Sequence, residues 1–303
     1  MRLLTGCLAC SGTNFKTILE STFEGSSLDA AQYFLANRQD VVHGRIQRCQ
    51  ACGFTFTNPQ FFAGDYNEIY KNIPRVTNSA SFDEADAQRF RRLARWVRSD
   101  VGTFDRFLDF GCGSGGFLVA MNDRAGAGFE VGEPGAFSVG PSLVTTGDIF
   151  DVVGTAGFEK GSFDLVTSFY VFEHLPDLEN YVKVLGSLLK PGGHMVIGLP
   201  NVKSWSARLS GGHWNNYLLE HLWYFDRKTM RRFMERQGFY ETRYRSAAYD
   251  APLAHIVRRV AQTYGLPTPH FGPRLSSIVL PVPIGLMYGV FQLEGKVAHA
   301  ART

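Results

Sequence analysis

A short apolar segment that runs into a cluster of glycines most constrains how this 303-residue chain can fold. Its sequence is Phe107-Leu-Asp-Phe-Gly-Cys-Gly-Ser-Gly-Gly-Phe117. Glycine adopts φ angles that other residues avoid and lets a ligand approach the backbone closely. The segment therefore predicts a strand, a tight ligand-binding turn and a helix. It does not identify the ligand by itself, because dinucleotide-binding domains share such a turn.

Beyond residue 100, short apolar runs alternate with helical segments, which is typical of parallel βαβ units. We expect strands at residues 107–110, 128–132, 143–146, 163–169 and 194–199. We expect helices at residues 79–99, 178–189 and 227–237, the first with Ser81 as its N-cap.

The apolar stretch 276–293 is long enough that a membrane span must be considered. Pro281, Pro283, Gly285 and Gly289 interrupt it, so we expect a buried or interfacial helix instead. Residues 296–301 are expected to form the last strand.

Composition divides the chain into three parts. We predict a small cysteine-bearing domain at residues 1–60, a helical bridge at 61–100 and an α/β domain at 101–303. Within the last part, residues from about 200 to 295 are expected to cover the substrate. A hydrophobic content of 45% supports a packed globular core rather than a disordered chain.

Four of the five cysteines form two Cys-x-x-Cys pairs, Cys7 with Cys10 and Cys49 with Cys52. Two such turns can bring four thiolates to the corners of one tetrahedral zinc ion. Since protein atoms would fill every coordination position, the pattern predicts a structural ion. A redox pair or two disulfides are the alternatives, disfavoured by the second copy of the motif and by the lack of a recognisable export signal. His43 is close in sequence to the second pair, but we do not expect it to bind the ion.

Acidic residues follow three successive predicted strands. Asp109 can receive a cationic amino group, Glu133 can bind ribose hydroxyls, and Asp148 can accept an adenine amino proton. Glu130 competes with Glu133 for the ribose. In this order, the segments DFGCGSGGF, GEP, GDI, FDLVTSFYVFEHLPD and LKPGGHMVIGLPN resemble the class I S-adenosylmethionine-dependent methyltransferases.

The resemblance covers roughly residues 90–245. It implies S-adenosylmethionine as cofactor and an α/β, Rossmann-like seven-stranded sheet, mostly parallel with an antiparallel last strand. It assigns the ribose to Glu133 with Pro134, and the adenine to Asp148 with Ile149. The methionine part of the cofactor is assigned to Asp109, Gly111, Cys112, Gly113 and Gly115, with Phe169 also in the site. A catalytic thiol at Cys112 is a less favoured alternative.

Two Glu-His pairs are candidates for chemistry at the methyl acceptor, Glu173-His174 and Glu220-His221. A base is needed where the acceptor carries a proton near neutral pH. His174 follows the fourth strand, and the alternative to a catalytic role is that it shapes the pocket. The second pair follows the fifth strand, where acceptors of this superfamily usually bind.

The segment around the second pair, with the N-terminal cysteines, resembles nucleotide-sugar C-methyltransferases. By that resemblance His221, assisted by Glu220, is the base that removes a proton beside a keto group. Leu218 and Leu219 depart from the family pattern, and the 303 residues are not expected to include the longer C-terminal domain of those enzymes. Packing or capping the following helix is the structural alternative for His221.

The formal net charge is only +3, and no basic stripe is visible, so a nucleic-acid partner is disfavoured. We expect a small polar acceptor: a sugar, a nucleotide-sugar, or a glycan or natural-product intermediate. A zinc-ribbon RNA methyltransferase is the alternative, and a non-catalytic module of the same fold is a third. A cytoplasmic location is expected, with peripheral membrane contact if the acceptor is a lipid-linked glycan.

Overall fold

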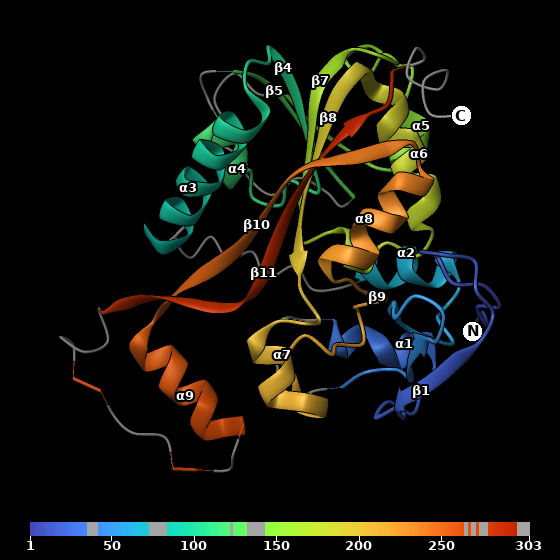
Figure 1. Ribbon diagram of the computed structural model, residues 1–303, viewed down its shortest axis with the longest axis vertical. Coiled ribbons are helices and arrows are strands. Elements are labelled where there is room, and N and C mark those ends of the chain that lie inside the picture. Colours follow the sequence, from blue (N-terminus) through green and yellow to red (C-terminus); the bar gives the residue numbers. More distant parts are fainter. Residues whose placement is uncertain are drawn as a thin grey trace.

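The computed structural model describes residues 1–34, 42–72, 84–121, 124–131, 143–263, 266–267, 271–272 and 278–295. These residues form a four-stranded sheet in the order β1-β2-β3-β9 and a seven-stranded sheet in the order β10-β11-β8-β7-β4-β5-β6. The smaller sheet lies beside the end of the larger one toward which β8 points (Figure 1).

Five parallel strands form the centre of the larger sheet. They are β6 (Leu143–Thr146), β5 (Ala125–Glu130), β4 (Arg106–Phe110), β7 (Phe163–Phe169) and β8 (Leu189–Pro200). The last strand, β11 (Val279–Leu293), is antiparallel to both of its neighbours, β8 and β10 (Phe239–Pro252). The predicted fold class is confirmed: an α/β, Rossmann-like sheet with an antiparallel last strand.

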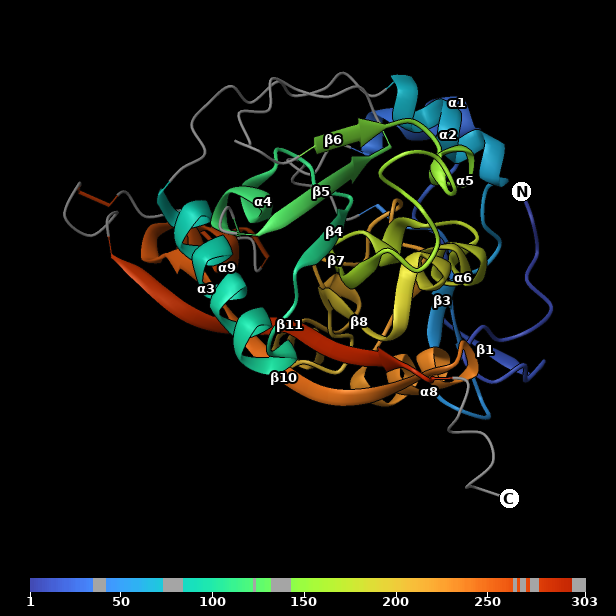
Figure 2. The ribbon, with the colours of Figure 1, turned by 90° about the horizontal axis from the view of Figure 1, so that it is seen from above.

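Helices cover both faces of this sheet (Figure 2). On one face lie α3 (Glu84–Val101) and α4 (Gly116–Ala120), and on the other α5 (Ile149–Val152), α6 (Leu178–Leu188) and α8 (Arg227–Arg236). In α6 the buried residues recur three or four positions apart, as on one face of a helix: Leu178, Val182, Leu185 and Leu188. The same spacing buries Leu93 and Val97 of α3. Each face thus has its own apolar core.

The N-terminal region forms a second, aromatic-rich unit. It contains β1 (Phe15–Leu19), α1 (Ser27–Ala30), the 3₁₀ helix η1 (Ala31–Tyr33), β2 (Ile46–Cys49), β3 (Thr55–Thr57) and α2 (Ala63–Asn72). Its fourth strand, β9 (Trp223–Tyr224), comes from much later in the chain and pairs with β3. Phe54 stacks on Trp223 and contacts Phe225, so rings from both parts share one core.

The expected helix at 276–293 is wrong, because Val279–Leu293 of this stretch form the strand β11. Proline has no N–H for a helical hydrogen bond. At Pro281 the strand pairs only with β10, whereas Met287 to Phe291 lie between β10 and β8. Near-continuous apolar sequence is what such an enclosed strand requires, since Met287 and Phe291 are buried.

Several other expectations differ in their bounds. The strand expected at 128–132 lies at Ala125–Glu130, and the helix expected at 79–99 at Glu84–Val101. Ser81 and the expected strand at 296–301 lie outside the described residues. The remaining elements are η2 (Phe172–His174), α7 (Trp205–Ser210), η3 (Gly211–His213) and α9 (Leu253–Thr263). In the part of the chain described, none of the helices has the length and apolar character needed to cross a membrane.

Candidate functional site

The glycine-rich turn joins β4 to α4 with three left-handed backbone positions. Gly111, Gly113 and Gly115 have φ angles of 74°, 53° and 77°, which strongly favour glycine. A Cβ atom on Gly111 would lie 2.3 Å from a methyl carbon of Val171. The amides of Gly111 and Cys112 both donate hydrogen bonds to the carbonyl of Phe129, which ties the turn to β5. The turn is therefore held in one shape between two parallel strands.

Asp109, at the end of β4, is the buried carboxylate beneath this turn. It is 2% exposed and accepts a 2.7 Å hydrogen bond from the Thr167 hydroxyl of β7. Burial raises its pKa to about 7, Thr167 lowers it, and the nearby charge of Glu130 raises it. Near neutral pH this carboxyl group consequently responds to any charge that a ligand brings.

Glu130 is the last residue of β5, and its carboxylate faces the turn. Its Oε2 accepts a 2.8 Å hydrogen bond from the amide of Gly113 and its Oε1 one of 3.1 Å from the amide of Val131. Glu133 and Pro134, which the sequence assigned to the ribose, lie outside the described residues. Among the described residues, the competing acid, Glu130, lies at the turn.

The other predicted cofactor residues occupy neighbouring positions. Asp148 caps α5 by accepting a 3.0 Å hydrogen bond from Phe150, and Ile149 is buried behind it. Phe169 packs edge-on against the ring of Phe117, with centroids 4.8 Å apart. Cys112 is buried, and burial raises the pKa of its thiol, so it stays protonated at neutral pH. A protonated, enclosed thiol does not suit a nucleophile.

Both Glu-His pairs lie at one end of a cleft, although they come from distant parts of the chain. Glu173 and His174 are in η2, directly after β7, and Glu220 and His221 precede β9. The two imidazole rings meet edge to face, with centroids 4.7 Å apart and an interplanar angle of 78°. The three carboxylate and imidazole groups of Glu173, His174 and His221 lie within 4.8 Å of one another.

Hydrogen bonds to the backbone orient these side chains. The Nδ1 atom of His221 lies 2.8 Å from the carbonyl oxygen of Asn216 and donates to it, because a carbonyl only accepts. The backbone of Leu222 links the two halves of the cluster. Its N–H donates to the carbonyl of Glu173 at 2.7 Å, and its C=O accepts from the N–H of Thr57 at 2.9 Å.

Burial governs the electrostatics of the cluster. It raises the pKa of Glu173 to about 8, with a further contribution from the charge of Glu220, and it raises the pKa of Glu220 to about 8. It lowers the pKa of His221 to about 4 and that of His174 well below its usual range. Because these four side chains are largely shielded from water, the charged form of each carboxyl and imidazole group is disfavoured.

One cleft of about 260 Å³ connects the turn with this cluster. Its lining includes Gly111 and Glu130 from the region of the turn and His174 and Glu220 from the cluster. Tyr66 of α2 also lines the cleft, so the predicted helical bridge contributes to its wall. Parallel α/β sheets bind ligands outside the carboxyl ends of their strands, which is where this cleft lies.

A family model described as a methyltransferase domain matches residues 85–243, just over half of the chain. The chain belongs to this methyltransferase family. Among curated relatives, the ubiquinone biosynthesis O-methyltransferase of Chelativorans sp. (strain BNC1) is 27% identical over 175 residues, which are 55% of this chain and 65% of that protein. The enzyme of the same name from Cronobacter sakazakii (strain ATCC BAA-894) is 34% identical over 119 residues, 36% of this chain and 49% of that one.

The methyltransferase chain thus spans between about half and two thirds of the length of these curated relatives. A solved structure of 1,6-didemethyltoxoflavin-N1-methyltransferase from Burkholderia thailandensis shares the fold, with a TM-score of 0.51 at 10% identity. The match covers 80% of this chain and 96% of that one. Family and sheet order together identify a class I, S-adenosylmethionine-dependent methyltransferase domain.

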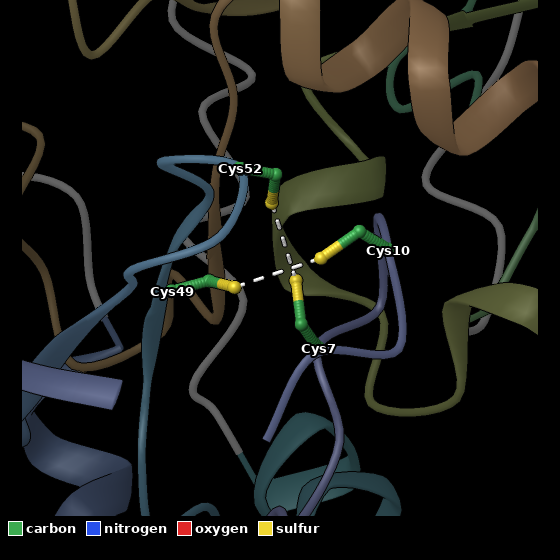
Figure 3. A group of neighbouring side chains, drawn as sticks. All are labelled: Cys7, Cys10, Cys49 and Cys52. Atoms are coloured by element: carbon green, nitrogen blue, oxygen red, sulfur yellow. Dashed lines mark hydrogen bonds between the residues drawn. The ribbon is translucent and has the colours of Figure 1, made fainter. Parts of the chain in front are cut away.

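The four cysteines of the methyltransferase's N-terminal unit converge from two turns (Figure 3). The sulfur atoms of Cys7 and Cys52 are 3.6 Å apart, as are those of Cys10 and Cys49. All four are free thiols, and these contacts join one turn to the other. Thiolates held at about 2.3 Å from one tetrahedral zinc ion are about 3.8 Å apart, so the cluster suits such an ion without rearrangement.

Two residues of the candidate site carried no recognisable sequence signal. Thr167 lies within an apolar strand and only the neighbouring strand brings it to Asp109. Tyr66 belongs to a segment that the sequence separates from the catalytic domain. Pairing of β7 with β4 places Thr167, and packing of the N-terminal unit places Tyr66; local sequence patterns encode neither.

Proposed function

We propose that this chain transfers the methyl group of S-adenosylmethionine to a small polar acceptor bound in the cleft. The observation that carries this proposal is the continuity of the cleft from Gly111 and Glu130 to His174 and Glu220. Methyl transfer is an in-line displacement at a sulfonium, so the protein mainly has to align two ligands and exclude water. One cleft with a cofactor end and a polar acceptor end satisfies this requirement.

At the cofactor end, Asp109 and the glycine turn take the methionine part, and Asp148 with Ile149 takes the adenine. Either Glu130 or Glu133 binds the ribose hydroxyls. The hydrogen bond from Gly113 supports Glu130, because it already holds that carboxylate beside the turn.

At the acceptor end, His174, Glu220 and His221 assist loss of a proton from the reacting group. An acceptor with a hydroxyl, or with a carbon beside a keto group, has such a proton. Sugars, nucleotide-sugars and glycan or natural-product intermediates belong to this class. The names of the curated relatives favour a second candidate, a hydroxylated aromatic precursor.

We also propose a structural zinc ion at Cys7, Cys10, Cys49 and Cys52. Its support is the convergence of four thiols at a spacing that suits a tetrahedral ion. With all four positions filled by sulfur, the ion stabilises the fold of the N-terminal unit and does not touch the acceptor.

The function is tested with purified protein, S-adenosylmethionine labelled in its methyl group and a panel of acceptors. The panel contains nucleotide-sugars, a 4-keto nucleotide-sugar, hydroxylated aromatics and RNA. Saturable label transfer to a small molecule, together with stoichiometric binding of S-adenosylhomocysteine, is the expected result. Transfer to RNA alone would reject the small-molecule assignment, and no binding of S-adenosylhomocysteine would reject the activity.

A further inference from the structure

We propose that Glu173, His174 and His221 bind a divalent cation at the acceptor end of the cleft. This inference rests on the proposed function only for what the ion does, because ion binding itself depends on the three side chains. Each offers one ligand atom, and the three atoms lie within 4.8 Å of one another. Atoms that bind one ion at about 2.1 Å are at most about 4.2 Å apart, so small side-chain rotations complete the site.

The hydrogen bonds of His221 leave the correct nitrogen available for an ion. Its Nδ1 donates to the carbonyl of Asn216, so Nε2 carries the lone pair. The Nδ1 atom of His174 is buried and has no hydrogen-bond partner within the part of the chain that the structure describes. Metal-binding histidines typically donate their other N–H to a carbonyl or carboxylate, which fixes the ring and directs the free nitrogen at the metal.

Glu173 provides the negative charge. The residue is 2% exposed, and its Oε2 atom has no hydrogen-bond donor among the described residues. A buried carboxylate oxygen without a donor is costly, and such groups in proteins are usually paired or bound to a metal. The side chain of Glu220 adds a second carboxyl group nearby. A divalent cation would balance the negative charge of both carboxyl groups.

Two imidazoles and one carboxylate form a ligand set suited to Mn²⁺, Fe²⁺, Zn²⁺ and related ions. Three protein ligands leave further positions open, and they open toward the cleft because His174 lines it. An acceptor hydroxyl bound there would have a lowered pKa and would lose its proton to water. The oxygen's electron pair would then form the bond to the methyl carbon, while the C–S electrons return to sulfur and leave S-adenosylhomocysteine.

This inference changes the role of His221 from base to ligand. Both roles predict that His221→Ala abolishes turnover, so activity alone does not distinguish them. Only the ligand role predicts that Glu173→Gln, which keeps the shape of the side chain, also removes metal binding.

The test is a titration of the full-length protein with Mn²⁺, followed by electron paramagnetic resonance, because Mn²⁺ prefers oxygen and nitrogen ligands to thiolates. The variants are Glu173→Gln, His221→Ala, and His213→Ala as the matched control at an exposed histidine of η3. Circular dichroism and thermal unfolding show whether each protein is folded, and calorimetry with S-adenosylhomocysteine measures cofactor binding separately.

We expect wild type and His213→Ala to bind one Mn²⁺ per chain. Glu173→Gln and His221→Ala should lose more than about tenfold in affinity, which is the loss caused by removing even an outer partner of a ligand. Equal Mn²⁺ binding by wild type and Glu173→Gln would overturn the site, as would no binding by folded wild type. Metal binding without any binding of S-adenosylhomocysteine would instead reject the proposed function and keep the site.

Discussion

The hydroxyl of Thr57, in β3 of the N-terminal unit, donates a 2.9 Å hydrogen bond to the backbone carbonyl of His221. The next residue, Leu222, accepts a second bond from the amide of Thr57 and donates to Glu173. The cysteine-bearing unit therefore holds the backbone of the acceptor end directly, and changes to that unit should alter acceptor chemistry more than cofactor binding.

Thr57→Val tests this hydrogen bond with little change in side-chain volume. We expect a loss of about 1 kcal/mol in the free energy of unfolding, because one buried hydrogen bond is removed. The corresponding fall in melting temperature is about 2–4 °C. Turnover should fall while the affinity for S-adenosylhomocysteine stays within about threefold of wild type, measured by thermal unfolding, kinetics and calorimetry. An equal loss of cofactor affinity would show that the bond does not act specifically on the acceptor end.

Removing one thiolate should release the zinc ion and loosen the small sheet. In Cys52→Ser we expect loss of bound zinc, measured by elemental analysis, and a lower melting temperature, because a structural site contributes folding energy. Since β9 pairs with β3, turnover should fall at least about tenfold. The matched control is Cys112→Ser, at the cysteine outside the cluster, which should keep its zinc. Full zinc content in Cys52→Ser would refute the four-thiolate site.

Alanine at Gly111 should disturb the cofactor turn by two effects. The added Cβ would lie 2.3 Å from Val171, and the φ of 74° costs a non-glycine residue about 1–2 kcal/mol. We expect the affinity for S-adenosylhomocysteine to fall at least about tenfold, measured by calorimetry. The control is Gly102→Ala, where φ is 84° but nothing lies within 4 Å of the added atom. That variant should lose some stability and keep its affinity, and a similar loss of affinity in both would contradict the argument.

Cofactor affinity should depend on pH through Asp109. Burial raises its pKa from 3.8 to about 7, so the ligand-free folded state loses stability as the pH rises from about 4 to 7, and Asp109 is ionised above 7. The facing groups are Thr167, Glu130 and Cys112, none of which is cationic. The cationic amino group of S-adenosylhomocysteine requires the ionised form, so affinity should fall about tenfold per pH unit below 7.

Calorimetric titration of S-adenosylhomocysteine between about pH 5.5 and 8.5 measures this dependence. Asp109→Asn cannot ionise, so its weaker binding should show no inflection near pH 7. If wild type and Asp109→Asn have parallel profiles, another group is responsible for the pH dependence.

Local patterns were sufficient for much of the fold. The strands at 143–146 and 163–169 match β6 and β7, because short apolar runs bounded by turns have one compact way to form parallel βαβ units. The apolar run ending at Leu293 was predicted to be a helix but is a strand. A strand buried between two neighbours and a buried helix both consist of apolar residues, so composition does not distinguish them.

The cofactor turn that most constrained the sequence interpretation is local, and its glycines adopt the conformations their order implies. The cysteine spacing likewise determined that four sulfur atoms could meet. The acceptor end depended on tertiary structure. The pairing of β9 with β3 and the hydrogen bond from Leu222 to Glu173 bring His221 to His174 and Glu173. Contacts between residues so distant in the chain depend on packing of the whole domain and leave no periodic pattern in the sequence.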